Sequence, residues 1–217
     1  MSTPMDPVQL QAASIGILGG TFNPPHDGHL RLARHALGEL KLDHVLLVPS
    51  HTPPHKPVQA DSATPEQRLA MCELAVADLD GVSACALEVL RGGASYTVDT
   101  LSEVHDARPD ADLTLIMGAD VALTLPSWRR PGSLLELAHI AVARREGSES
   151  GGEELARLVE GLARDGARMS ILEMPPIEVS SSLVRERAAA GLPIDGLVPQ
   201  AVADYIEEHR LYKGRKR

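Results

Sequence analysis

The sequence predicts a single α/β domain built on a doubly wound parallel sheet. Short apolar segments of about five residues alternate with helical patterns along all 217 residues, which is typical of parallel strands covered on both faces. No internal repeat and no internal linker divides the chain. One phenylalanine, one tryptophan and three tyrosines are its only aromatic residues. The core is therefore expected to consist of aliphatic side chains.

The first half of the chain shows three strand patterns and two helical patterns. Strands are expected at Ser14–Gly19, His44–Val48 and Val82–Val89. One helix is expected at His26–Leu40, because its apolar residues recur at helical spacing. A second helix should follow Thr64, which begins a capping box with a proline at the first helical position, and should run to about Asp78. The residues from Pro49 to Ala60 form a proline-rich loop.

The second half repeats the alternation. Strands are expected at Leu113–Met117, His139–Ala143 and Met169–Leu172. Helices are expected at Thr97–His105, from the end of the polar loop Glu146–Glu154 to about Asp165, at Ser181–Ala190 and at Pro199–His209. We expect the domain to span residues 14–212, between a flexible extension at residues 1–13 and a basic tail at residues 213–217.

Composition excludes several classes of protein. The formal net charge is −9, and no basic stripe suggests a nucleic-acid partner. No apolar run reaches the ~18–20 residues of a membrane span, and the N-terminus lacks the features of a signal peptide. Cys72 and Cys85 are too few for a disulfide framework or a zinc cluster and are expected to be reduced and buried. These features favour a cytoplasmic protein.

The chemistry is expected just after the first strand, because ligands of such sheets bind at the carboxyl ends of the strands. Gly19 and Gly20 allow a tight turn there and expose amide donors. His26 and His29 follow at the start of a helix, three residues apart and so on one face. A helix N-terminus attracts anions, and two imidazoles beside it can donate to phosphate oxygens. A zinc pair is the alternative, but no third ligand with a suitable spacing follows.

The segment Gly20–His29 resembles the G-x-F-x-P-x-H-x-G-H signature of the nucleotidyltransferase superfamily that adenylylates or cytidylylates small phosphates. Four further segments resemble bacterial nicotinate-mononucleotide adenylyltransferases, as does the chain ending Tyr205–Tyr212; these segments are Ser50–Lys56, Ser95–Leu101, Met117–Trp128 and Val179–Arg185. Asn23 stands where that family commonly has Asp, Ser182 where it has Thr, and Val179 and Val184 where it has Ile. These departures are conservative.

The resemblance implies a Rossmann-like fold of adenylyltransferase type and a step of NAD biosynthesis. ATP and nicotinate mononucleotide would react to nicotinate adenine dinucleotide and pyrophosphate, with Mg²⁺ entering with ATP and no metal ligands on the protein. The residues implied at the ATP site are Gly19, Gly20, Thr21, Phe22, His26, His29, Asp120, Ser181, Ser182 and Arg185. The residues implied at the mononucleotide site are Lys56, Tyr96, Thr97, Trp128 and Arg129. No nucleic acid and no membrane is expected as a partner, and the sequence leaves open whether the chain forms a homo-oligomer.

Read as chemistry, His26, His29 and Arg185 are the candidate catalytic residues. A phosphate is already a nucleophile near neutral pH, so the reaction needs positioning and charge neutralisation rather than a base. Ser181 and Ser182 precede Arg185 at a helix start, where hydroxyls and amides form a second anion site. Trp128 can stack on a flat pyridine ring, and Thr97 with nearby amides would bind the nicotinate carboxylate.

Two alternatives remain at this point. The first is a sister adenylyltransferase that uses nicotinamide mononucleotide or phosphopantetheine as the acceptor. The second is a non-catalytic module that senses nucleotides. Three of the candidate site residues also have a purely structural interpretation: Lys56 as a solvated side chain, Asp120 as a helix cap and Trp128 as part of the core.

Overall fold

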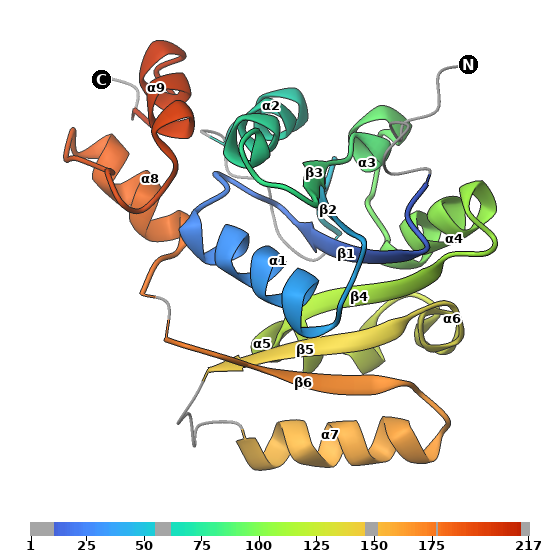
Figure 1. Cartoon of the computed structure of the whole chain (residues 1–217). Helices are drawn as coiled ribbons and strands as arrows, with labels where there is room; N and C mark the ends of the chain where they lie inside the picture. Colours follow the sequence, from blue (N-terminus) through green and yellow to red (C-terminus); the bar gives the residue numbers. More distant parts are fainter. Residues whose placement is uncertain (1–10, 55–61, 146–151, 177, 214–217) are drawn as a thin grey trace.

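The computed structural model describes residues 11–54, 62–145, 152–176 and 178–213. These form one six-stranded sheet in the order β3-β2-β1-β4-β5-β6, in which every neighbouring pair is parallel (Figure 1). The strands are β1 (Ser14–Gly20), β2 (His44–Pro49), β3 (Val82–Ala84), β4 (Asp112–Gly118), β5 (His139–Arg145) and β6 (Met169–Met174). The chain builds β1 to β3 outward in one direction and then returns to β4 on the other side of β1.

Helices cover both faces of the sheet. One face carries the helices α1 (Asp27–Glu39), α2 (Pro65–Val76), α8 (Ser181–Ala189) and α9 (Gln200–Glu208). The other carries α3 (Leu87–Arg91), α4 (Thr97–Ala107), α6 (Pro131–Leu137) and α7 (Gly152–Arg164). The short helix α5 (Ala119–Ala122) and the 3₁₀ turn η1 (Leu125–Ser127) follow β4 and pack on this second face. The doubly wound fold predicted from the alternation is confirmed.

Two aliphatic cores form because successive strand residues point to opposite faces. In β2, Val45 and Leu47 join the core under α1 and α2, whereas Leu46 and Val48 join the core under α4. All four are fully buried, which explains the continuous apolar run of this strand. Gly16 in β1 lets its neighbours approach closely, since a Cβ there would lie 2.8 Å from Cδ1 of Ile116.

Most predicted elements are confirmed to within a few residues, and one is wrong. The strand expected at Val82–Val89 ends at Ala84, and residues Leu87–Arg91 form helix α3 instead. A short apolar run of this kind fits a strand and a buried helix turn equally well. In the helix that forms, the buried Glu88 carboxylate accepts a short hydrogen bond of 2.5 Å from Thr100 of α4. The helices α5 and α6 and the 3₁₀ turn η1 are too short to show a hydrophobic period in the sequence.

The two ends of the chain fall partly outside the described residues. This holds for residues 1–10 of the expected extension and for residues 214–217 of the expected basic tail. Of the rest of the extension, Ala12 is buried in the core. Cys72 and Cys85 are both buried. Within the described parts of the chain, no helix is long and apolar enough to cross a bilayer.

Candidate active site

A cavity of about 800 Å³ opens at the carboxyl ends of β1 and β4, where the strand order reverses. Doubly wound sheets bind their ligands at such a switch point, and the volume suits a nucleotide. All ten residues predicted for the ATP site line it: Gly19, Gly20, Thr21, Phe22, His26, His29, Asp120, Ser181, Ser182 and Arg185. They come from three segments of the chain, which the fold brings together.

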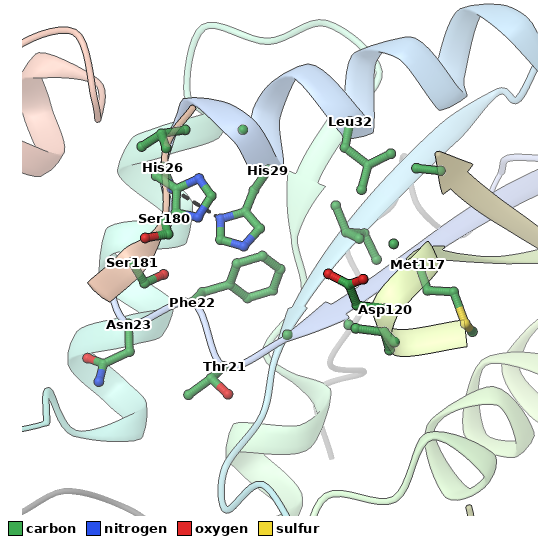
Figure 2. A pocket seen from close by; sticks show the side chains of 18 of the residues that line it. Thr21, Phe22, Asn23, His26, His29, Leu32, Met117, Asp120, Ser180 and Ser181 are labelled. Carbon is green, nitrogen blue, oxygen red and sulfur yellow. Dashed lines mark hydrogen bonds between the residues drawn. The ribbon is translucent and has the colours of Figure 1, made fainter. Parts of the chain in front are cut away.

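The loop after β1 folds back so that Phe22 lies beneath His29. Phe22 has a left-handed φ of 48° and is almost fully buried. Its ring meets the His29 ring edge-on, with centroids 4.8 Å apart (Figure 2). Gly20 makes this possible, because a Cβ there would lie 3.0 Å from the Phe22 ring. A Cβ on Gly19 would meet nothing within 4 Å and would project into open space beside the loop.

His26 and His29 stack on one another at the start of α1, with ring centroids 3.7 Å apart. The backbone N–H of His26 donates to Nδ1 of His29 over 3.2 Å. Because Nδ1 accepts this bond, the proton of a neutral His29 sits on Nε2, from which it can be donated. His26 Nδ1 is buried without a hydrogen-bond partner among the described residues.

Burial decides the charge of this pair. Loss of hydration lowers the pKa of His26 to about 4. It also lowers the pKa of His29 well below its usual value, and the neighbouring His26 adds to this effect. Both rings are therefore neutral at neutral pH in the absence of a ligand. They offer the cavity dipoles and N–H donors rather than fixed positive charge.

Arg185, in the first turns of α8, supplies the fixed charge, and the N-terminus of α8 lies beside the histidine pair (Figure 2). Ser180 caps this helix, and its hydroxyl accepts from the N–H of Leu183 over 3.2 Å. Arg185 donates to the carbonyl of Asn23 over 2.8 Å and to Oγ of Ser182 over 3.1 Å. Ser181 donates to the carbonyl of Pro24 over 2.8 Å. The helix start that was predicted as a second anion site is thus also tied to the loop after β1.

Asp120 lies in the first turn of α5, directly after β4, and faces the histidine pair across the cavity (Figure 2). It is the one carboxylate among the described residues that line the cavity. In the described parts of the chain, no three histidine, cysteine, aspartate or glutamate residues are grouped to hold a metal ion. This donor set fits a cation that is carried mainly by substrate phosphates, as Mg²⁺ is in many nucleotide enzymes.

Four of the five residues predicted for the mononucleotide lie outside this cavity in a second cluster: Tyr96, Thr97, Trp128 and Arg129. The Arg129 guanidinium sits 4.6 Å above the Tyr96 ring, and Asp99 binds Arg129 and Arg130. Trp128 is half-buried and donates its indole N–H to Thr124 over 2.9 Å. Thr97 begins α4 beside Tyr96. Lys56 falls outside the described residues.

The loop after β2 connects the cluster to the cavity. Pro53 lines the cavity, and the preceding Thr52 pairs with Ala94. Ser95 then binds this loop twice, through Thr52 O and His51 N–H. Ser95, directly before Tyr96, thus joins the cluster to the loop that reaches the cavity.

Comparison with known proteins places the chain in a family. Residues 17–187 match the cytidylyltransferase-like family model. A relative from Synechococcus sp. (strain JA-3-3Ab), named "probable nicotinate-nucleotide adenylyltransferase", is 41% identical over 96% of this chain and 99% of its own length. A relative of the same name from Aeromonas salmonicida is 40% identical, over 93% and 98%. This chain belongs to the nicotinate-nucleotide adenylyltransferase family.

The fold agrees with that family. The nicotinic acid mononucleotide adenylyltransferase of Plasmodium falciparum, solved in complex with NaAD, superposes with a TM-score of 0.74 over 92% of this chain and 97% of its own. Its sequence identity is 16%, so this similarity concerns the fold alone.

Three side chains of this adenylyltransferase family member take part in the site without having been assigned a role from the sequence. Asn23 was noted only as a departure, yet its Oδ1 accepts from the buried Tyr212 hydroxyl over 2.8 Å. Arg68 is buried in α2 and also lines the cavity. A signal for Arg68 was present, because residue 68 falls on the same helix face as the buried Met71, Cys72 and Ala75. No local pattern could pair Tyr212 with Asn23.

Proposed function

We propose that the protein transfers the adenylyl group of ATP to nicotinate mononucleotide, giving nicotinate adenine dinucleotide and pyrophosphate in NAD biosynthesis. Family membership supports the reaction type. The observation that carries the proposal is the stacked pair of His26 and His29, which faces the α8 N-terminus and Arg185 inside one nucleotide-sized cavity.

The reaction requires that a phosphate oxygen of the mononucleotide attack the α-phosphorus of ATP. That P–O bond forms while the bond from the α-phosphorus to the bridging oxygen breaks, and pyrophosphate leaves with the electron pair. No protein nucleophile or base is needed, since the attacking phosphate is already an anion. The work of the protein is to align the two phosphates and to stabilise the charge of the transferring group.

The residues of the cavity suit these two tasks. His29 donates Nε2–H to a bridging or non-bridging oxygen, and its ring is held by Phe22 and by the His26 backbone. Arg185 supplies positive charge from α8, and Ser181 and Ser182 add donors. Asp120 would be the residue to hold water ligands of an ATP-bound Mg²⁺ or a ribose hydroxyl, and the metal would supply neutralisation of the polyphosphate charge.

The second cluster is proposed to bind the mononucleotide. Trp128 and Tyr96 offer flat faces for the pyridine ring, and Lys56 and Arg129 offer charge for its phosphate. Thr97 and the amides at the start of α4 are the candidate donors to the nicotinate carboxylate. An amide in place of that carboxylate would lose charge-assisted hydrogen bonds, which predicts a preference for the acid.

Pyrophosphate release with matched acceptors tests the function. The protein is incubated with Mg²⁺ and ATP, and with nicotinate mononucleotide, nicotinamide mononucleotide or phosphopantetheine. We expect the fastest release with the nicotinate form. Equal rates with the amide would remove the acid preference, and faster release with phosphopantetheine would indicate the sister activity. ATP binding without turnover on any acceptor would indicate a sensing module.

The cytoplasmic location and the oligomeric state stay predictions.

A further inference from the structure

Arg68 is a buried cation bound to three backbone carbonyls. It is only 3% exposed, although arginine is rarely buried without an ionic partner. Its Nη1 donates to Thr21 O over 2.7 Å, its Nη2 to His51 O over 2.9 Å and its Nε to Ala63 O over 3.3 Å. No carboxylate of the described residues lies within the 4.0 Å of an ion pair. The side chain is thus used as a rigid fork for backbone atoms.

The three carbonyls belong to three different segments. Thr21 lies in the loop after β1, one residue before Phe22, which packs under His29. His51 lies in the loop after β2, which binds the start of α4 through Ser95. Ala63 directly precedes α2, the helix that carries Arg68 itself. One guanidinium therefore joins the loop of the predicted ATP site to the loop that leads to the predicted mononucleotide site.

This arrangement matters because the two substrates must meet in line. Each half-site has its own contacts, and the pairing of β1 with β2 ends at Gly20 and Pro49, so that contacts beyond the strands must fix how the two loops lie relative to one another. The backbone bond from Ser50 N–H to Gly20 O joins the same two loops one residue earlier. Beyond that bond, the Arg68 fork binds Thr21, which lines the cavity, and His51, which lies two residues before the cavity-lining Pro53.

We propose that Arg68 is a positioning residue that keeps the two half-sites in register for phosphoryl transfer. This proposal rests on the proposed two-substrate reaction. It assigns Arg68 no contact with the reacting atoms. Lysine keeps the charge but cannot reach three carbonyls at once, so charge and geometry can be separated experimentally.

Kinetics of Arg68→Lys and Arg68→Met provide the first test, with Arg157→Met on the far helix α7 as the matched control. We expect kcat to fall by about 10²-fold in both variants, because a displacement of about 1 Å costs that much. The Kd of ATP alone, measured by calorimetry, should change by less than about threefold. A near-normal kcat in Arg68→Lys would show that charge alone suffices and would overturn the proposal. Loss of ATP binding in both variants would also contradict it.

Hydrogen exchange provides a second test that needs no turnover. In the wild-type protein, ATP should slow exchange at the amides of Ser50, His51 and Ser95, although these lie on the acceptor side. In any Arg68 variant that folds, this protection should be lost, while protection within β4 and β5 stays. Absence of the ATP effect in the wild type would refute the proposal even if neither variant folded. If ATP protected these amides but no acceptor substrate released pyrophosphate, the proposed reaction would be refuted and the role of Arg68 in joining the two loops would not.

Discussion

At the scale of single residues, His29 is the side chain whose loss should reduce catalysis most. We expect His29→Ala to lower kcat at least ~10²-fold, because one preorganised donor to the developing charge is lost. The measurement is pyrophosphate release at saturating substrates. His35→Ala, further along the same helix and with no ligand role, is the control. A near-normal kcat in His29→Ala, with an unchanged far-ultraviolet spectrum in both variants, would remove His29 from the mechanism.

Trp128 gives a second prediction at this scale. Trp128→Ala should raise the KM for the mononucleotide roughly tenfold and leave the KM for ATP nearly unchanged, because a stacked ring contributes about 1–3 kcal/mol. Trp128→Phe keeps a flat face but not the bond to Thr124, and should recover most of the affinity. If the ATP KM moves instead, the ring site lies elsewhere.

The site residues differ in how far the sequence could predict them. His26, His29 and Arg185 stand in dense local motifs, and the structure brings them into one cavity. Phe22 was predicted at the site, but its role as a support for His29 depends on a left-handed backbone and on the bare Cα of Gly20. The contacts of Arg68 join segments 5, 17 and 47 residues away. Such contacts depend on the assembled sheet.

At the scale of elements, two helix N-termini face the same cavity, and α8 depends on its cap. Ser180→Ala removes the acceptor for the Leu183 N–H and should lower the free energy of unfolding by about 1 kcal/mol. Because α8 carries Ser181, Ser182 and Arg185, we expect the KM for ATP to rise a few-fold. Thermal unfolding measures the loss of stability, and pyrophosphate release at varied ATP concentration measures the change in KM.

The control for that prediction is Thr64→Ala, which removes the cap of α2. It should cost similar stability, while its hydroxyl has no bond to the α8 residues. An equal loss of ATP affinity in both variants would show that general loosening, and not the α8 terminus, is responsible.

Helices and strands were predictable where the segment was long enough to show its hydrophobic pattern. Helix α1 has thirteen residues and one buried stripe, and the centres of strands β1, β2 and β4 are mostly apolar. The prediction of a strand through the residues after β3 was wrong, because helix α3 has only five residues, which are too few to show a helical period. Its contacts are not local in sequence: Arg91 donates to Glu103 and Thr100 of α4, and Glu88 accepts from Thr100.

At the scale of the whole molecule, the two ends of the domain meet at the site. β1 leads directly into the cavity, and Tyr212 returns 189 residues after Asn23 to bind its side chain. Ala63 N–H donates to the same oxygen, and Asn23 Nδ2 donates to Ser62. The loop that carries the histidines is thus held by α2, α8 and the last described turn of the chain. Its rigidity is a property of the complete fold.

The buried histidines predict how the stability of the whole molecule depends on pH. The pKa of His26 falls from 6.5 to about 4 on folding, and burial lowers the pKa of His29 and of His139 in the same direction. Between pH 6.5 and 4 the unfolded chain therefore binds more protons than the folded protein, and stability decreases as the pH falls. His26 alone should cost about 2 kcal/mol between pH 7 and pH 5.

Urea unfolding of the ligand-free protein at pH 7 and pH 5 measures this loss, and His26→Gln should make it smaller by about that amount. His209→Gln is a suitable comparison, because His209 lies on the surface at the end of α9 and should leave the difference unchanged. Bound ATP should reduce the loss in the wild type, since phosphate oxygens beside the rings favour the imidazolium. If the wild-type protein were equally stable at both pH values, the pKa of His26 in the folded protein would equal its pKa in the unfolded chain, and burial would not keep the ring neutral. Higher stability at pH 5 than at pH 7 would mean that His26 is already protonated in the folded protein at pH 7, so that the pair would meet the phosphates as a cation, and not as the neutral donors on which the proposed role of His29 depends.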